Sequence, residues 1–205
     1  MAGMVARVAI LASGEGTNAE RLVVAARGRS DIEVALVGCN RPRAGVLDRA
    51  ARLGVPAFVF DREALAAGEV TRRLLAERID FIALAGFLLK VPSDLVAAFY
   101  GRMMNLHPAL LPAFGGKGMY GHHVHQAVHA ALLEGAVRET GITLHWVDAE
   151  YDEGPPFFQA SVALDRSVDT PDSIAGKVAD LEALHYAPQT LRAIVEALSL
   201  SQRTP

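Results

Sequence analysis

The chain has 205 residues, 51% of them hydrophobic, and a formal net charge of −3 at pH 7. This length and composition predict one domain with a substantial core, and the interspersed acidic and basic residues argue against a surface that binds nucleic acid or a membrane. The single cysteine, Cys39, excludes a disulfide within the chain, which is typical of a protein of the reducing cytoplasm.

Apolar runs alternate with segments of helical periodicity in the first half of the chain. The first run, at 5–11, is short and contains Arg7, so it predicts a buried strand rather than a signal peptide or a membrane span. Further strands are predicted at 32–37, 57–60, 81–84 and 102–106, and helices at 18–26, 45–53, 62–77 and directly after Pro92. Because these strands are apolar throughout rather than at every second residue, they indicate a parallel sheet with helices on both faces.

The second half of the chain has a different pattern. A helix is predicted at 122–135, and residues 141–147 alternate between apolar and polar side chains. That segment and the run at 157–163 indicate an antiparallel addition to the edge of the sheet. A last helix is predicted at 171–199, before a polar tail that we expect to be frayed. The sequence therefore predicts the α/β class, with a doubly wound, mostly parallel sheet in a single domain over residues 1–205.

The loop after the first strand reads Ser13-Gly14-Glu15-Gly16-Thr17-Asn18 and leads directly into a helix. Its two glycines permit a tight turn, and the free N–H groups and dipole of the helix favour a bound phosphate. The loop lacks the Lys-Ser/Thr pair of a Walker A motif and the third glycine of a dinucleotide fingerprint. A single phosphate, as on a ribonucleotide, is therefore favoured. The alternative is an ordinary strand-to-helix turn capped by Thr17 or Asn18.

The fifth predicted strand leads into the segment NLHPALLP, residues 105–112. Side chains alternate along a strand, so Asn105 and His107 are expected on the same face. An amide can donate to a developing oxyanion and an imidazole can move a proton, which is the pairing that transfer of a small carbonyl group between amines needs. The alternative for His107 is a buried histidine whose hydrogen bonds are made by the backbone.

Asp152 lies in the segment YDEGPP, residues 151–156, between the two strands of the predicted edge addition. Acidic residues at such a position usually form turns. A carboxylate beside His107 would raise the pKa of the imidazole and fix its tautomer. Glu153 is the competing candidate for this role.

Three histidines, His122, His123 and His125, follow a glycine-rich loop that contains Lys117. Their spacing matches no metal-binding motif, and no cysteine or acidic partner lies nearby in the sequence. We therefore expect no metal site. We expect the histidines to line a loop or to cap a helix, and the loop around Lys117 to be mobile or to line a substrate site.

The chain resembles the phosphoribosylglycinamide formyltransferases, folate-dependent enzymes of purine synthesis. The resemblance extends over nearly the whole chain and is carried by VAILASGEGTN, LAGFLLKVP, NLHPALLP, GITLHWVDAEYDEGP and the last helix. The combination of NxHPxLLP with a downstream DxGP is specific to enzymes that use formyl-tetrahydrofolate. The resemblance implies a formyltransferase-like variant of the Rossmann fold, with a nucleotide- and phosphate-binding half at 1–100 and a catalytic and folate-binding half at 101–205.

The resemblance also implies roles for individual residues. Asn105, His107 and Asp152 match the catalytic trio of the family. The phosphate of the ribonucleotide is expected at Gly16, Thr17 and Asn18, with Glu182 of the last helix on the same side. The folate is expected to contact Arg62, Leu88, Leu89, Lys90, Val91, Asn105, Asp148, Ala149, Glu150, Tyr151 and Asp152.

Three features depart from the family pattern. Leu89 occupies a position that is basic in many members and is followed by Lys90, although the family contacts there are mainly to the backbone. The loop after NLHPALLP is longer than in many members, so its histidines have no secure counterpart. The match of Glu182 requires one extra residue before Pro188.

The activity implied by the resemblance is transfer of the formyl group of 10-formyltetrahydrofolate, a co-substrate, to the amine of glycinamide ribonucleotide in de novo purine biosynthesis. The amine would attack the formyl carbon directly, through a tetrahedral intermediate and with no metal. We expect a cytoplasmic enzyme, monomeric or homodimeric, with small-molecule substrates and no nucleic-acid or membrane partner.

Three alternative functions are weighed against this one. A formyltetrahydrofolate deformylase uses the same three residue types with water as the acceptor, and a methionyl-tRNA formyltransferase resembles the same core. We expect the first to carry a further N-terminal domain and the second a C-terminal tRNA-binding domain, and neither is expected in this chain. A non-catalytic nucleotide-binding protein with the same sheet is disfavoured by the presence of Asn105, His107 and Asp152.

Overall fold

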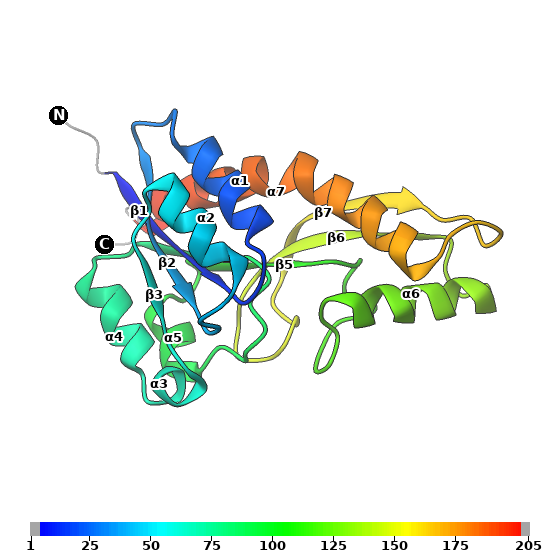
Figure 1. Ribbon diagram of the computed structural model, residues 1–205, viewed down its shortest axis with the longest axis horizontal. Helices are drawn as coiled ribbons and strands as arrows, with labels where there is room; N and C mark the ends of the chain where they lie inside the picture. The colour runs from blue at the N-terminus through cyan, green and yellow to red at the C-terminus, as the bar shows by residue number, and fades with distance from the viewer. Residues whose placement is uncertain (1–4, 202–205) are drawn as a thin grey trace.

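The computed structural model describes residues 5–201, whose strands form a seven-stranded sheet with helices on both faces (Figure 1). The strands are β1 (Ala6–Ala12), β2 (Ile32–Cys39), β3 (Ala57–Val59), β4 (Phe81–Leu84), β5 (Met103–His107), β6 (Glu139–Trp146) and β7 (Pro156–Ala163). Their order is β3-β2-β1-β4-β5-β6-β7, parallel from β3 to β5, whereas β6 and β7 pair antiparallel at one edge. The predicted fold class is confirmed, including the antiparallel edge addition.

The described helices other than α6 lie in two layers. The helices are α1 (Thr17–Ala26), α2 (Gly45–Leu53), α3 (Arg62–Ala66), α4 (Glu69–Ala76), α5 (Ser93–Ala98), α6 (His122–Glu134) and α7 (Pro171–Ser201). α1, α2 and α7 cover one face of the sheet, and α3, α4 and α5 cover the other (Figure 1). In β1, Val8 and Ile10 join the core under the first layer, whereas Ala9 and Leu11 join the core under the second. Both faces of this strand are buried, which is why its sequence is apolar without alternation.

The observed elements differ from the predicted ones mainly at one position. The helix predicted over 62–77 is two helices, α3 and α4, separated at Gly68, whose φ of +72° is in the left-handed region that glycine tolerates. α3 begins after Asp61, whose carboxylate accepts the N–H of Ala64 at 2.7 Å. α7 extends to Ser201, two residues beyond the predicted end, and the rest of the expected frayed tail lies outside the described residues.

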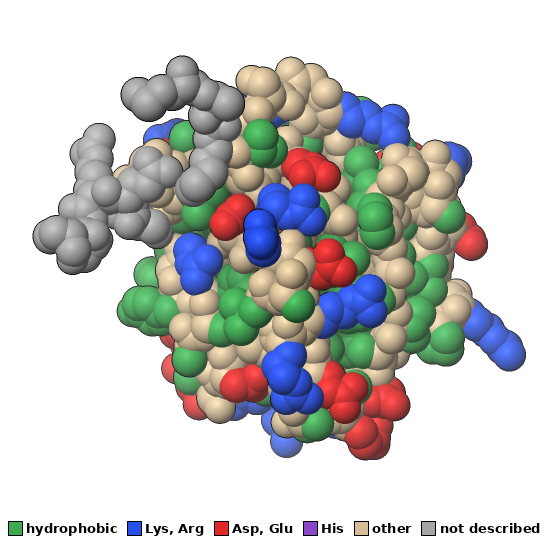
Figure 2. All heavy atoms as spheres, turned by 90° about the vertical axis from the view of Figure 1, so that its left-hand side faces the viewer, with side chains coloured by type: hydrophobic (Ala, Val, Ile, Leu, Met, Phe, Trp, Pro, Cys, Tyr) green, Lys and Arg blue, Asp and Glu red, His purple; other side chains and the backbone are tan. Residues whose placement is uncertain are grey.

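The surface is mixed in charge. On the face that Figure 2 shows, basic and acidic side chains are interspersed with apolar ones, as the composition suggests. Within residues 5–201, no helix combines the length and the apolar character that crossing a bilayer requires.

Strand pairing brings distant segments to one end of the sheet. Leu11 of β1 pairs with Leu84 of β4, and Leu84 pairs with Asn105 of β5, so the loops that leave these three parallel strands begin side by side. On the other side of β5, Asn105 pairs with His145 of β6. Ligands of open α/β sheets bind beyond the carboxyl ends of the strands, and Asn105 and His145 lie at this end of the sheet.

Candidate active site

A cleft of about 770 Å³ lies at this end of the sheet. Every residue predicted from the sequence to belong to the site lines this cleft. These residues are Gly16, Thr17, Asn18, Arg62, Leu88, Leu89, Lys90, Val91, Asn105, His107, Asp148, Ala149, Glu150, Tyr151, Asp152 and Glu182. The fold therefore brings together segments that are more than 160 positions apart in the chain, such as Asn18 and Glu182.

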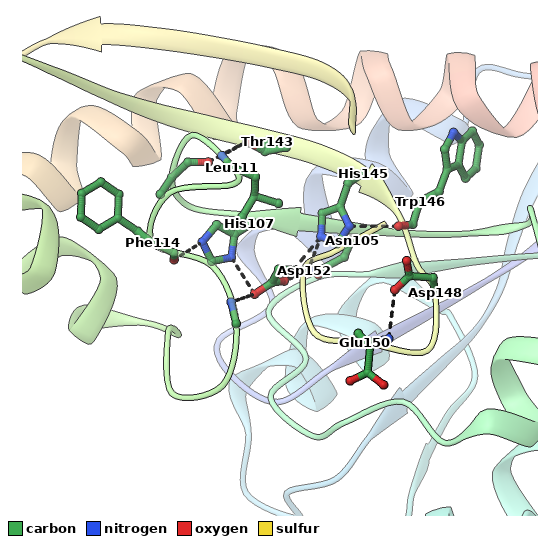
Figure 3. A network of polar contacts seen from close by, with 12 residues as sticks. Asn105, His107, Leu111, Phe114, Thr143, His145, Trp146, Asp148, Glu150 and Asp152 are labelled. Atoms are coloured by element: carbon green, nitrogen blue, oxygen red, sulfur yellow. Dashed lines mark hydrogen bonds and ion pairs between the residues drawn. The ribbon is translucent and has the colours of Figure 1, made fainter. Parts of the chain in front are cut away.

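Asn105, His107 and Asp152 converge at the end of β5 (Figure 3). The Asn105 Nδ2 group donates to Asp152 Oδ1 at 3.3 Å, and His107 Nδ1 lies 3.4 Å from Asp152 Oδ2. Asn105 and His107 project from the same face of β5, as strand alternation requires. The amide, the imidazole and the carboxylate thus form one connected cluster in the cleft.

The hydrogen bond of His107 to the backbone fixes its tautomer. Its Nε2 lies 2.8 Å from the carbonyl oxygen of Phe114, and because a carbonyl only accepts, Nε2 carries the proton. Burial lowers the pKa of His107 below the ordinary 6.5, although the Asp152 charge acts in the opposite direction. The Asp152 charge does act to raise this pKa, as predicted, but burial outweighs it, and the Phe114 carbonyl rather than Asp152 fixes the tautomer. Nδ1 is left as the nitrogen that can accept a proton.

Asp152 is held as a carboxylate. Burial acts to raise its pKa, but the neighbouring His145, the charge of His107 and the Gly116 N–H at 3.0 Å together lower that pKa below 3.8. Phe114 and Asp152 both have a φ of 57°, a left-handed conformation that non-glycine residues rarely adopt and that is common at functional sites. The competing candidate Glu153 is exposed and does not line the cleft.

His145 is a further buried member of this cluster that the sequence analysis did not single out. Its Nδ1 lies 3.0 Å from the carbonyl oxygen of Trp146 and therefore carries a proton, which leaves Nε2 to accept from Asn105 Nδ2 at 3.2 Å. Nε2 also lies 3.5 Å from Asp152 Oδ1. The alternation of the strand indicates that His145 points away from Ile142 and Leu144, but only the register of β6 against β5 places it opposite Asn105.

The loop between β1 and α1 leads into a helix N-terminus that has no side-chain cap. The N-cap residue is Gly16, with a φ of +76°, and no side chain caps the helix, so the alternative of a Thr17 or Asn18 cap is wrong. A Cβ at Gly16 would come within 2.5 Å of Val46 in α2, so both the conformation and the packing require glycine. The first N–H groups of α1 thus have no side-chain acceptor among residues 5–201 and lie at the cleft wall.

Asn18 and Glu182 lie side by side at this N-terminus. The Asn18 amide donates to Glu182 Oε2 at 2.8 Å and its oxygen accepts from Arg21 at 2.7 Å. Burial raises the pKa of Glu182, and its contact with Asn18 acts in the opposite direction. The sequence match that required an extra residue before Pro188 therefore leads to a glutamate that contacts the predicted phosphate loop.

Lys90 connects two segments of the cleft that are 60 positions apart. Its Nζ lies 3.2 Å from Glu150 Oε2 and 5.7 Å from the centre of the Tyr151 ring. The segments 88–91 and 148–152, both expected to contact folate, are joined by this side chain. Leu89, which replaces a basic residue of the family pattern, is half-buried beside it.

The three histidines after the glycine-rich loop begin α6. His125 is buried and lines the cleft, whereas His122 lies 3.9 Å from Asp172 of α7 and His123 stacks edge-on with Tyr120. Among residues 5–201, no group of three or more His, Cys, Asp or Glu side chains is arranged to hold a metal ion. Lys117 lines the cleft, in line with one of the two expectations for its loop.

Comparison with known proteins identifies related sequences and structures. The model of the family described as "Formyl transferase" matches residues 6–191. Phosphoribosylglycinamide formyltransferase of Bacillus subtilis is 34% identical over 186 residues, 88% of this chain and 90% of that protein. The chloroplastic phosphoribosylglycinamide formyltransferase of Arabidopsis thaliana is 37% identical over 84% of this chain, which spans only 60% of that protein's length. The crystal structure of glycinamide ribonucleotide transformylase 1 from Symbiobacterium toebii matches with a TM-score of 0.79 and 34% identity, over 93% of this chain and 86% of that one.

Proposed function

The chain belongs to the formyl transferase family, and on that premise we propose that it transfers the formyl group of 10-formyltetrahydrofolate to the amine of glycinamide ribonucleotide in de novo purine biosynthesis. One observation carries this proposal. Asn105 and His107 each lie within hydrogen-bonding or ion-pairing distance of Asp152, in the same cleft as an uncapped helix N-terminus. The cleft thus combines groups suited to acyl transfer with a group suited to a phosphate.

Each substrate is assigned to one side of the cleft. The phosphate of the ribonucleotide lies at Gly16, Thr17 and Asn18, where the dipole of α1 favours an anion, with Glu182 beside it. The folate lies against Arg62 and the segments 88–91 and 148–152. Residues 1–100 then supply the nucleotide- and phosphate-binding half, and residues 101–205 supply the catalytic residues and much of the folate site.

The reaction is a direct transfer. The amine nitrogen attacks the formyl carbon, a C–N bond forms, and the carbonyl π electrons move to oxygen. The bond between that carbon and N10 of the folate then breaks, so that the products are the formylated nucleotide and tetrahydrofolate. One proton leaves the attacking nitrogen and one reaches N10, which balances the reaction.

Three side chains have separate tasks in this reaction. Asn105 donates an N–H to the oxygen as it becomes negative. Its present bonds to His145 and Asp152, at 3.2 and 3.3 Å, are long enough to be replaced by a shorter bond to that oxygen. His107 accepts the amine proton at Nδ1 and returns it to the leaving nitrogen. Asp152, 3.4 Å from Nδ1, stabilises the imidazolium between these two steps.

The proposal also covers the partners, the cellular location and the oligomeric state of the enzyme. We assign it small-molecule substrates only, with no nucleic-acid or membrane partner, no metal, and a cytoplasmic location as a monomer or homodimer. Much of the rate enhancement would come from holding the amine and the formyl carbon together in the cleft.

The test is consumption of 10-formyltetrahydrofolate by the purified protein, with and without glycinamide ribonucleotide. We expect consumption only with the nucleotide, and one formylated nucleotide formed per tetrahydrofolate released. Turnover without the nucleotide would indicate the hydrolytic deformylase reaction instead. Binding of the nucleotide without turnover would indicate a binding protein and would contradict the proposal.

A further inference from the structure

The hydroxyl of Ser13 joins three loops of the cleft. Ser13 is buried, and its Oγ lies 2.5 Å from Oδ1 of Asn40, the first residue after β2. The N–H of Leu88, in the segment that follows β4, donates to the same Oγ at 2.9 Å. Ser13, at the end of β1, thus holds both of the neighbouring loops.

These two bonds fix the orientation of the Asn40 amide. Because Ser13 Oγ already accepts from Leu88, its own proton needs an acceptor, and the Asn40 oxygen is the acceptor within reach in the described part of the chain. The NH₂ group of Asn40 is therefore turned away from Ser13. Asn40 is partly exposed and lines the cleft, and its NH₂ group donates to no other residue between 5 and 201.

The surroundings of Asn40 favour an anionic ligand. Asn40 lines the same cleft as residues 14–18. The start of α2, which follows the turn after Asn40, is joined to that loop because the Val46 N–H donates to the Gly14 carbonyl at 3.1 Å. The next residue, Arg41, is exposed, lines the cleft and makes no ion pair with any described residue. Two neutral N–H donors held in place beside a free guanidinium suit the oxygens of a phosphate ester.

We propose that Asn40, oriented by Ser13, is a further substrate-binding residue that donates to the phosphate of a phosphorylated ribose, with Arg41 supplying the opposite charge. This inference rests on the proposed function and extends it. A phosphate has more oxygens than the first N–H groups of α1 can satisfy, and Asn40 approaches from the next strand of the sheet. Two loops, after β1 and after β2, would then recognise one phosphate.

The test uses ribose 5-phosphate and ribose as probes, with binding measured by titration calorimetry. Asn40→Asp keeps an oxygen for the Ser13 hydroxyl but replaces the donors with a second acceptor and a negative charge. We expect the Kd of ribose 5-phosphate to rise about tenfold for Asn40→Ala and by more for Asn40→Asp, the scale of hydrogen bonds to a charged group. Gln189→Glu, which makes the same chemical change on α7 outside the cleft, should leave the Kd unchanged.

The outcomes separate this inference from the proposed function. An unchanged Kd in Asn40→Asp, or a wild-type protein that binds ribose 5-phosphate no better than ribose, overturns the inference even if formyl transfer is observed. Weakened binding in both Asn40 variants sustains it even if the acceptor proves to be another phosphorylated amine. If instead the KM of formyl-folate rises in these variants while the Kd of ribose 5-phosphate stays the same, Asn40 serves the other substrate and the assignment is wrong.

Discussion

The protonation of His107 decides what this cleft can do at neutral pH. Burial lowers the pKa of the ring and the Phe114 carbonyl holds the proton on Nε2, so Nδ1 is free to accept a proton near pH 7. Asp152 opposes the effect of burial, so it keeps the ring basic enough to act while remaining ionised itself. The carboxylate therefore matters most once the imidazole has become charged.

The pH profile of kcat/KM tests this assignment. We expect a rate that is lost as the pH falls, with a midpoint below 6.5, because protonation of Nδ1 removes the base. In Asp152→Asn the negative charge that raises the pKa of His107 is gone, so the midpoint should move to still lower pH. The rate itself should fall about 10²- to 10⁴-fold, the range of general acid–base catalysis. A midpoint that moved to higher pH would contradict the roles given to both residues.

Asn105 can be tested independently of the proton transfer. Asn105→Ala removes the N–H that would stabilise the oxyanion, and we expect kcat to fall about 10²- to 10³-fold with little change in either KM. Steady-state kinetics measure both quantities. A kcat within a few-fold of the wild type would remove Asn105 from the catalytic group, and a rise in KM alone would make it a binding residue.

At the scale of elements, the hydrogen bonds of Ser13 join the segments that follow β1, β2 and β4. Ser13→Ala leaves the Leu88 N–H without its acceptor and releases the Asn40 amide. We expect the KM of both substrates to rise about three- to tenfold, the scale of one or two hydrogen bonds, with kcat nearly unchanged.

Thr140→Val is the matched control for this prediction. Thr140, in β6, is also a buried hydroxyl, but its Oγ1 has no hydrogen-bond partner among the described residues. Its removal should leave both KM values unchanged. Equal effects of the two variants would show that Ser13 only supports the fold.

The elements predicted well from the sequence are those with a clear local pattern of apolar residues. β4 and α2 were predicted residue for residue, because an apolar run and a helical period each have clear ends. The division between α3 and α4 was missed because the apolar spacing continues through 62–77, and the left-handed turn at Gly68 outweighs it. A period describes which face is buried, but a single backbone angle decides whether the helix continues.

At the scale of the whole molecule, the site depends on which strands are neighbours. Motifs that could be read in the sequence, such as Asn105 and His107, were assigned from local alternation and from resemblance to a family. His145 lies in a segment that carries the resemblance but has no role assigned from it, and Asn40 carries no motif. Their positions follow from the register of β6 on β5 and from the order of β2 beside β1. Residues of this kind can be found only when the pairing of the strands is known.

The connection between β7 and α7 holds the edge of the sheet to the last helix. Asp169, with a side chain only 3% exposed, accepts from Lys177 Nζ at 2.7 Å, from the Asp165 N–H at 2.7 Å and from Ser173 Oγ at 2.8 Å. Burial alone would raise its pKa, but these partners lower the pKa of Asp169 to about 2. Because the folded-state value lies below the unfolded value of 3.8, this carboxylate stabilises the fold above that pH and loses its contribution as the pH falls toward 2.

Urea unfolding of Asp169→Asn measures this contribution. At pH 7 we expect the variant to be less stable by about 1–3 kcal/mol, since bonds to a charged, buried group are lost and Lys177 loses its carboxylate partner. The difference from the wild type should shrink below pH 4, because the unfolded wild-type chain then begins to take up a proton on this carboxyl, and the carboxylate contributes less to the stability of the fold. Asp172→Asn, in the first turn of the same helix but with a side chain 92% exposed, should change stability by no more than a few tenths of a kcal/mol at either pH. If the difference in unfolding free energy between Asp169→Asn and the wild type stayed constant from pH 7 to pH 2.5, the packing of this side chain rather than its charge would stabilise α7 against the sheet.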